Sequence, residues 1–205
     1  MDFITIIDYI GTFAFAISGI RLASAKQFDW FGAYVVGFVT AVGGGTIRDL
    51  MLDVPPFWML QADYLIVTAA ALGFVIVFGK FVIRLNNTFF IFDAIGLGLF
   101  AVVGIEKSIT HGYPMWVSLI MGTMTGAAGG VIRDTLINEV PLIFRKEIYA
   151  LACVFGGLCY YLCMYLDVTE TLTQIIAAVA VIVARILAVK YGISLPNLKG
   201  ENQNT

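Results

Sequence analysis

Charged residues are scarce in this sequence. Only 13% of its 205 residues are Asp, Glu, Lys or Arg, while 60% are hydrophobic. A soluble domain carries about 25% charged residues, so a water-facing surface could not be covered, and a soluble globular domain is excluded. Disorder is excluded as well, because it needs low hydrophobicity and high charge. The net charge of −2 and the absence of a basic patch give no support for a nucleic-acid partner.

Metal ligands are also few. The sequence has one histidine, His111, and three cysteines, Cys153, Cys159 and Cys163. These residues offer no ligand set for a structural metal, so we expect no cofactor and no metallo-enzyme. The apolar runs are long and continuous, whereas a membrane β-barrel shows short segments of alternating polarity. The sequence therefore predicts an all-α integral membrane protein.

Seven apolar segments are long enough, or nearly so, to span a bilayer, which takes about 20 residues. They are Phe3–Leu22, Trp30–Leu52, Tyr64–Ile83, Phe89–Ile105, Met115–Ile137, Tyr149–Leu166 and Leu172–Val189. We interpret residues 1–195 as a single transmembrane domain and residues 196–205 as a polar tail. Seven spans place ten Lys and Arg residues on one side and two on the other. The excess marks the cytoplasmic side, so the N-terminus is expected outside and the C-terminus in the cytoplasm.

The chain matches itself at a constant offset of 85 residues without a gap. The matches are Asp8 with Asp93, Gly11 with Gly96, Phe15 with Phe100, Gly19 with Gly104, Thr40 with Thr125, Arg48 and Asp49 with Arg133 and Asp134, Pro56 with Pro141, and Tyr64 with Tyr149. Apolar matches carry little weight in so hydrophobic a chain, but the Asp, Arg and Pro matches do. The pattern predicts two repeats, at about 3–84 and 88–166, followed by a seventh helix at about 172–190. Because each repeat holds three spans, the second enters the membrane inverted, with a transport site near the repeat interface.

The middle span of each repeat contains a run of glycines. The first run is Gly43, Gly44 and Gly45, and the second includes Gly126, Gly129 and Gly130. Membrane helices use glycine either to pack closely or to break and line a polar passage. Because the glycines are contiguous and are followed at once by Arg-Asp, we favour a break over close packing.

Six of the ionisable residues within the spans fall at matched positions of the two repeats, and ionisable residues at membrane depth mark ion or substrate routes. They are Asp8, Arg48, Asp49, Asp93, Arg133 and Asp134. One interpretation is structural, with each Arg paired either to the Asp beside it or across the repeat axis, Arg48 with Asp134 and Arg133 with Asp49. The other is that these residues, with Thr40 and Thr125, border a conduction path. An intramembrane aspartyl protease is disfavoured, because duplication alone accounts for the pair Asp8 and Asp93.

These residues resemble a known family. Gly-Gly-Gly-Thr-Ile-Arg-Asp at 43–49, Gly-Gly-Val-Ile-Arg-Asp at 129–134 and the proline after each are similar to the motifs of the prokaryotic trimeric intracellular cation channels. The resemblance covers about residues 3–190. It implies a homotrimer of seven-helix protomers in the bacterial or archaeal plasma membrane, surrounded by membrane lipids.

The resemblance further implies a pore in each protomer that conducts monovalent cations, chiefly K⁺. The protein would hold no structural metal and would bind K⁺ only transiently. The same domain in some bacterial relatives is described as a glycine transporter, so a carrier of a small neutral amino acid remains the alternative. Animal members place a lysine before the second glycine run, a region tied to regulation by acidic phospholipid or Ca²⁺. Here that stretch begins Thr125-Gly126 and has no lysine, so this regulation is not expected.

Overall fold

The computed structural model describes residues 2–84, 88–145 and 148–196, and the regular elements in this part of the chain are all helices. Its elements are α1 (Phe3–Ala25), α2 (Trp30–Met51), α3 (Phe57–Leu60), α4 (Asp63–Arg84), α5 (Thr88–Thr110), α6 (Met115–Leu136), the 3-10 turn η1 (Leu142–Phe144), α7 (Ala150–Tyr165) and α8 (Glu170–Tyr191). The long helices agree with the predicted apolar segments to within a few residues at most ends. The predicted polar tail, apart from residue 196, lies outside the described residues.

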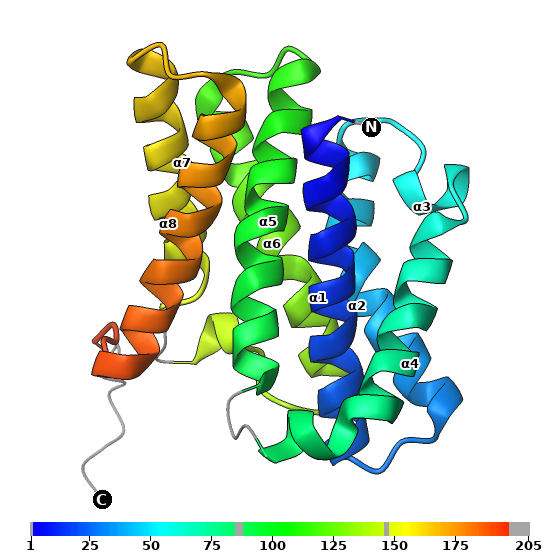
Figure 1. Cartoon of the computed structure of the whole chain (residues 1–205). Helices are drawn as coiled ribbons and strands as arrows, with labels where there is room; N and C mark the ends of the chain where they lie inside the picture. Colours follow the sequence, from blue (N-terminus) through cyan, green and yellow to red (C-terminus); the bar gives the residue numbers. More distant parts are fainter. Residues whose placement is uncertain (1, 85–87, 146–147, 197–205) are drawn as a thin grey trace, which may run out of the picture.

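The long helices run up and down a single bundle (Figure 1). We call the end at which α1 begins the upper end and the end at which α1 finishes the lower end. In Figure 1, α1 descends and α5 ascends, while α2 ascends and α6 descends. The chain thus begins its first helix at the upper end and finishes α8 at the lower end.

Five of these helices are long and apolar enough to cross a membrane: α1, α2, α5, α6 and α8. The segments Asp63–Gly79 of α4 and Ala150–Tyr165 of α7 are apolar but shorter. Many large hydrophobic side chains lie on the outside of the bundle, among them Trp30, Phe31 and Trp116. Exposed apolar surface of this extent fits lipid rather than water as the surrounding solvent. The chain is therefore a multi-pass membrane protein.

The offset of 85 residues reappears in the structure. The bounds of α1 and α5 differ by 85 residues at both ends, and so do those of α2 and α6. The loops repeat as well, because the left-handed residues Gln27 and Asp53 are matched by Gly112 and Asn138, which have φ between 56° and 81°. A left-handed residue commonly follows the end of a helix, so the corresponding helices of the two halves end in the same backbone conformation.

The centre of the bundle is formed by α1, α2, α5 and α6. The rings of Phe15 on α1 and Phe100 on α5, which are repeat partners, lie 5.2 Å apart between centroids. Both side chains are buried among small residues of the same helices. Helices α4, α7 and α8 pack around this four-helix core (Figure 1).

The glycine runs do not break their helices, so the predicted helix breaks are wrong. Both α2 and α6 are continuous through the glycines. The helices cross there instead: a Cβ on Gly44 would lie within 3.0 Å of the Thr125 carbonyl oxygen, and a Cβ on Gly129 within 3.0 Å of the Thr40 carbonyl oxygen. Side chains at these positions would separate the two backbones. The glycines therefore serve the close packing that membrane helices obtain from small residues.

Candidate functional site

A cluster of charged residues centres on Asp49 at the upper end of the bundle. The Nε of Arg48 donates a hydrogen bond to Oδ1 of Asp49 at 2.8 Å, and Nζ of Lys107 lies 2.9 Å from the same oxygen. The other carboxylate oxygen accepts from the backbone N–H of Phe57 at 2.9 Å. Since Phe57 begins α3, the carboxylate satisfies an N–H that the helix itself leaves free. Asp49 thus joins the end of α2 to α3 and to Lys107 of α5.

A second cluster, at the lower end, centres on Arg133. Its Nε donates to Oδ1 of Asp134 at 2.8 Å, and the other oxygen of Asp134 accepts from the N–H of Leu142 at 3.0 Å. This repeats the arrangement of the upper cluster. In addition, Nη1 of Arg133 donates to Ser18 Oγ at 2.8 Å and forms an ion pair with Asp93. The lower cluster therefore connects α1, α5, α6 and η1.

Pairing across the repeat axis is wrong as a prediction, and the competing pairing of neighbours is what the structure shows. Arg48 binds Asp49 and Arg133 binds Asp134. The reason is the direction of the helices: α2 and α6 run in opposite directions and cross near Gly44 and Gly129. The Arg-Asp pairs follow the crossing on each helix, so they lie at opposite ends of the bundle.

The aspartates of α1 and α5 are repeat partners, yet their surroundings differ. Asp8 accepts a hydrogen bond from the hydroxyl of Tyr64 at 2.5 Å. Asp93 instead binds Arg133. The hydroxyl of Tyr149, the partner of Tyr64, has no hydrogen-bond partner among the described residues, and neither has Oδ2 of Asp93. Equivalent residues thus occupy two arrangements within one molecule: the aspartate is held by tyrosine at the upper end and by arginine at the lower end.

The two clusters also differ in their access to solvent. A cavity of 260 Å³ opens beside the upper cluster. It is lined by Ile4, Thr5, Asp8, Arg48, Phe57, Gln61, Tyr64, Val103, Glu106, Lys107 and Thr110. At the lower end, Asp93 and Arg133 are each 0% exposed. Among the described residues, the polar core is therefore open to a cavity at the upper end and sealed at the lower end.

The threonines that we predicted to line a path lie between the two clusters, at the helix crossing. Thr40 and Thr125 are fully buried, and their hydroxyls donate to the carbonyls of Val36 and Met121, both at 2.6 Å. A helix commonly absorbs a threonine hydroxyl in this way. Neither threonine lines the upper cavity in this conformation.

The other predicted glycines lie around the same crossing. A Cβ would come within 3.0 Å of Ile132 at Gly43, of Phe57 at Gly45, of Leu97 at Gly126 and of Tyr149 at Gly130. These contacts are made mainly with side chains and partly with the Leu97 carbonyl oxygen. All six glycines therefore act as spacers between packed elements.

Some residues of the two clusters and of the upper cavity were not predicted as site residues from the sequence. Lys107 lies just beyond an apolar segment, and Ser18 is a single hydroxyl within one. Tyr64 and Tyr149 were noted only as repeat matches, although a tyrosine recurring in two apolar spans is a signal for a buried hydrogen bond. Glu106, which lines the upper cavity, accepts from Tyr160 of α7.

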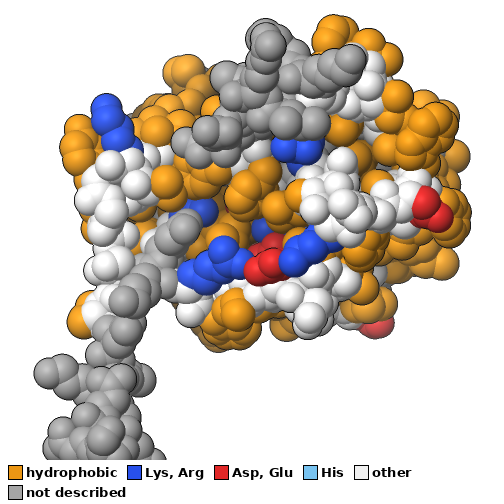
Figure 2. Space-filling model, turned by 90° about the horizontal axis from the view of Figure 1, so that it is seen from below, with side chains coloured by type: hydrophobic (Ala, Val, Ile, Leu, Met, Phe, Trp, Pro, Cys, Tyr) orange, Lys and Arg blue, Asp and Glu red, His pale blue; other side chains and the backbone are white. Residues whose placement is uncertain are grey.

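The lower end carries a surface ion pair outside the spans, with charged side chains amid apolar surface (Figure 2). Nζ of Lys26 lies 2.6 Å from the carboxylate of Glu139, and Arg145 lies 3.4 Å from the other oxygen. The hydrogen bond from Lys26 lowers the pKa of the Glu139 carboxyl, since it favours the charged form. This pair links the loop after α1 to the loop after α6.

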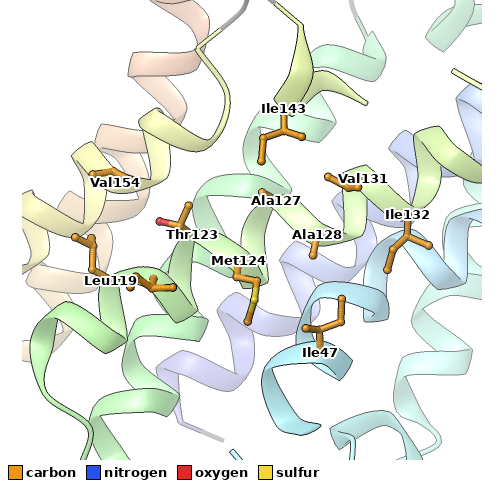
Figure 3. A pocket seen from close by; sticks show the side chains of 11 residues that line it. Ile47, Leu119, Thr123, Met124, Ala127, Ala128, Val131, Ile132, Ile143 and Val154 are labelled. Carbon is orange, nitrogen blue, oxygen red and sulfur yellow. The ribbon is translucent and has the colours of Figure 1, made fainter. Parts of the chain in front are cut away.

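A separate cavity of 490 Å³ lies on the outside of α6, against α2, α7 and η1 (Figure 3). Its lining is almost entirely apolar, with Ile143 on η1 and Thr123 on α6 on its walls. At the positions 85 residues earlier, Trp58 and Phe38 pack edge to face at 5.5 Å between centroids, and Trp58 donates to Thr46. Large aromatic rings thus stand in the first half where small side chains leave space in the second. An apolar cavity of this kind offers no site for an ion.

Comparison with known proteins places the chain among bacterial membrane proteins. The family model described as Glycine transporter matches two segments, residues 5–80 and 90–165. The UPF0126 inner membrane protein YadS of Escherichia coli strain K12 is 38% identical over 193 residues, covering 93% of each chain. A UPF0126 membrane protein of Vibrio cholerae is 35% identical, covering 93% of this chain and 81% of that protein.

Solved structures of similar fold are cation channels. One is a structure described as the structural basis for conductance through TRIC cation channels. It matches with a TM-score of 0.85 and 38% identity, and the match covers 98% of this chain and 99% of that one. Another, the TRIC trimeric intracellular cation channel orthologue from Rhodobacter sphaeroides, has a TM-score of 0.88 and 31% identity, covering 94% and 100%. These relatives are membrane proteins and channels, so the chain is not an enzyme.

Proposed function

Because this chain belongs to the Glycine transporter family and shares the fold of the prokaryotic TRIC cation channels, we propose that it is a K⁺-permeable cation channel. It assembles as a homotrimer, and each protomer contains its own pore. The protomer crosses the bacterial inner membrane seven times, with its N-terminus outside and its C-terminus in the cytoplasm. The first six spans form two inverted repeats of three, and α8 is the added seventh.

One observation carries the proposal: two equivalent charged clusters stand at opposite ends of one four-helix core, one open and one sealed. Ionisable residues at membrane depth are costly, and they mark ion pathways. Opposite directions of α1 and α5, and of α2 and α6, support the inverted repeat, whose interface is where such folds place the site. The proposed path runs between α1, α2, α5 and α6, past Thr40 and Thr125.

The differing arrangements of Asp8 and Asp93 indicate how the lower end opens. In the proposed open state, Arg133 leaves Asp93, and Tyr149 donates to that carboxylate, as Tyr64 already does to Asp8. The free hydroxyl of Tyr149 and the free Oδ2 of Asp93 are the groups that this exchange needs. Asp134 stays bonded to Leu142, so η1 keeps its place while Arg133 moves.

The carboxylate of Asp93 is the group that favours cations over anions at the sealed cluster. Here Asp93 and Asp134 pair with the guanidinium of Arg133, while a second buried guanidinium, that of Arg185, lies over the ring of Tyr149. When Arg133 withdraws, the carboxylate of Asp93 is exposed to the path, and a carboxylate or hydroxyl oxygen suits a hard monovalent cation. An anion would meet the like charge of Asp93, at a cost that the low dielectric increases.

Recording from purified protein in planar bilayers containing KCl tests the proposal. We expect unitary current steps, and we expect Asp93→Asn to change the K⁺ over Cl⁻ permeability ratio while the trimer still forms. Asp53→Asn, a carboxylate on a loop outside the proposed path, is the matched control. Absence of unitary steps from well-assembled protein would contradict the channel.

A carrier of a small neutral amino acid such as glycine is the second candidate. The upper cavity is lined by two acids, Asp8 and Glu106, and two bases, Arg48 and Lys107. Its size and mixed charge suit a zwitterion, whose carboxylate would face the bases and whose ammonium would face the acids. The description of the family model agrees with this candidate.

Uptake of labelled glycine into liposomes separates the two candidates. A carrier gives saturable uptake that Asp8→Asn and Arg48→Gln both weaken, without unitary currents. A channel gives unitary currents in KCl, and the flux of labelled glycine does not saturate in the same range.

A further inference from the structure

A groove distinct from the polar path lies at the lower end, between α1, α2 and α4. Its volume is 370 Å³. It is lined by Ile20, Arg21, Ser24, Phe28, Trp30, Ala33, Leu72, Val75, Ile76 and Gly79. One charged residue, Arg21, and one hydroxyl, that of Ser24, stand among otherwise apolar and aromatic walls. The groove therefore combines a cation with a hydrocarbon-like surface.

Arg21 has no partner for its charge among the described residues. Its Nε is buried and donates to no hydrogen-bond acceptor there. Neighbouring charges are already engaged, since Lys26 binds Glu139 and the carboxylate of Asp29 accepts from the N–H of Gly32 at 2.6 Å. A buried donor without an acceptor is costly, so the position calls for an anion from outside the chain.

We propose that Arg21 binds the phosphate of an anionic membrane phospholipid, whose acyl chain lies along α4 against Leu72, Val75 and Ile76. A guanidinium matches a phosphate with paired, charge-assisted hydrogen bonds. Trp30, which is 72% exposed at the start of α2, supplies an aromatic ring of the kind that sits at headgroup depth. The apolar wall adds contacts with the acyl chain of a lipid, which free phosphate cannot make.

Space on the wall of the groove supports the path of the acyl chain. A Cβ on Gly79 of α4 would meet nothing within 4 Å. Lipid can therefore approach the backbone of α4 closely below Ile76. Arg21 takes no part in either charged cluster, so this site is independent of the proposed conduction path.

Lipid binding to the purified full-length protein, followed by native mass spectrometry, tests the site. The probes are phosphatidylglycerol, phosphatidylcholine and inorganic phosphate. We expect the wild type to prefer phosphatidylglycerol, and Arg21→Ala to weaken that binding at least about tenfold, the effect of losing a hydrogen bond between charged groups. Arg21→Lys should keep most of the binding. Lys26→Ala, which removes a cation at the same end of α1, should change it less than about twofold.

A second variant addresses the acyl chain without removing charge. Gly79→Phe places a ring in the groove, where the fold has room for it, and should weaken phosphatidylglycerol binding while thermal stability is retained. Equal binding of phosphatidylglycerol by wild type, Arg21→Ala and Gly79→Phe would overturn the proposal. So would inorganic phosphate that competes with the lipid at equal concentration, because the ligand would then be a free anion.

Discussion

Replacement of Gly129 by alanine is the sharpest perturbation of the helix crossing. The added Cβ would lie within 3.0 Å of the Thr40 carbonyl oxygen, which belongs to the backbone of α2 and cannot rotate away. Overpacking of this kind costs about 1–3 kcal/mol, sometimes more. Alanine gains back about 1 kcal/mol over glycine in a helix. Because a whole helix must shift, we expect an overpacking cost near the top of its range, about 3 kcal/mol. After the gain from alanine, the net loss of stability is about 2 kcal/mol, or roughly 30-fold in the folding equilibrium.

Reversible unfolding in mixed micelles measures this change. Gly44→Ala, at the partner position of the first half, should be destabilised to a similar extent, since its Cβ would meet the Thr125 carbonyl oxygen. Gly73→Ala is the control: its Cβ meets nothing within 4 Å, so this variant should gain up to about 1 kcal/mol. If Gly129→Ala were as stable as Gly73→Ala, close crossing of α2 and α6 would be refuted.

Three further results are expected. Removal of Arg133 strands the buried Asp93 and should cost about 3–5 kcal/mol; a double-mutant cycle should find strong coupling of Arg133 with Asp93 and none of Arg48 with Asp134, and the reverse pattern would restore pairing across the axis. Lys26→Ala should raise the pKa of the Glu139 carboxyl toward its ordinary value, as measured by carboxyl NMR; in the wild type the lowered pKa means that the pair stabilises the fold above the unfolded-state pKa and is lost as pH falls through the folded-state pKa, so an unmoved pKa would contradict the ion pair. A reporter fused after residue 205 should be active in the cytoplasm, and an active alkaline phosphatase fusion there would contradict the proposed orientation.

The positions of the helices follow directly from the sequence, because long apolar runs leave little choice in a bilayer. The equivalence of Asp8 with Asp93 was likewise foreseen from the 85-residue offset, whereas the predicted segments end at Leu22 and Ile105, short of the ends of α1 at Ala25 and of α5 at Thr110. What the helix directions add is the separation of the clusters. Two motifs that match in sequence meet only at their glycines, and the charged residues that follow are carried to opposite ends.

The glycine runs show a limit of local reasoning. Contiguous glycine lowers helix propensity, which argued for a break in α2 and α6. The helices nevertheless stay continuous, because each glycine run packs against a backbone carbonyl of the other helix. The difference between Asp8 and Asp93 was equally beyond reach, because identical residues at matched positions predict one arrangement, whereas the structure holds two.

The reversal potential in a KCl gradient distinguishes a cation channel from an unselective pore and from a carrier. Purified trimer in a planar bilayer, with KCl more concentrated on one side, should give unitary currents that reverse near the K⁺ equilibrium potential. Reversal near zero would mean a pore without preference for cations. No unitary current, together with saturable uptake of labelled glycine by the same preparation, would contradict the channel and establish the carrier.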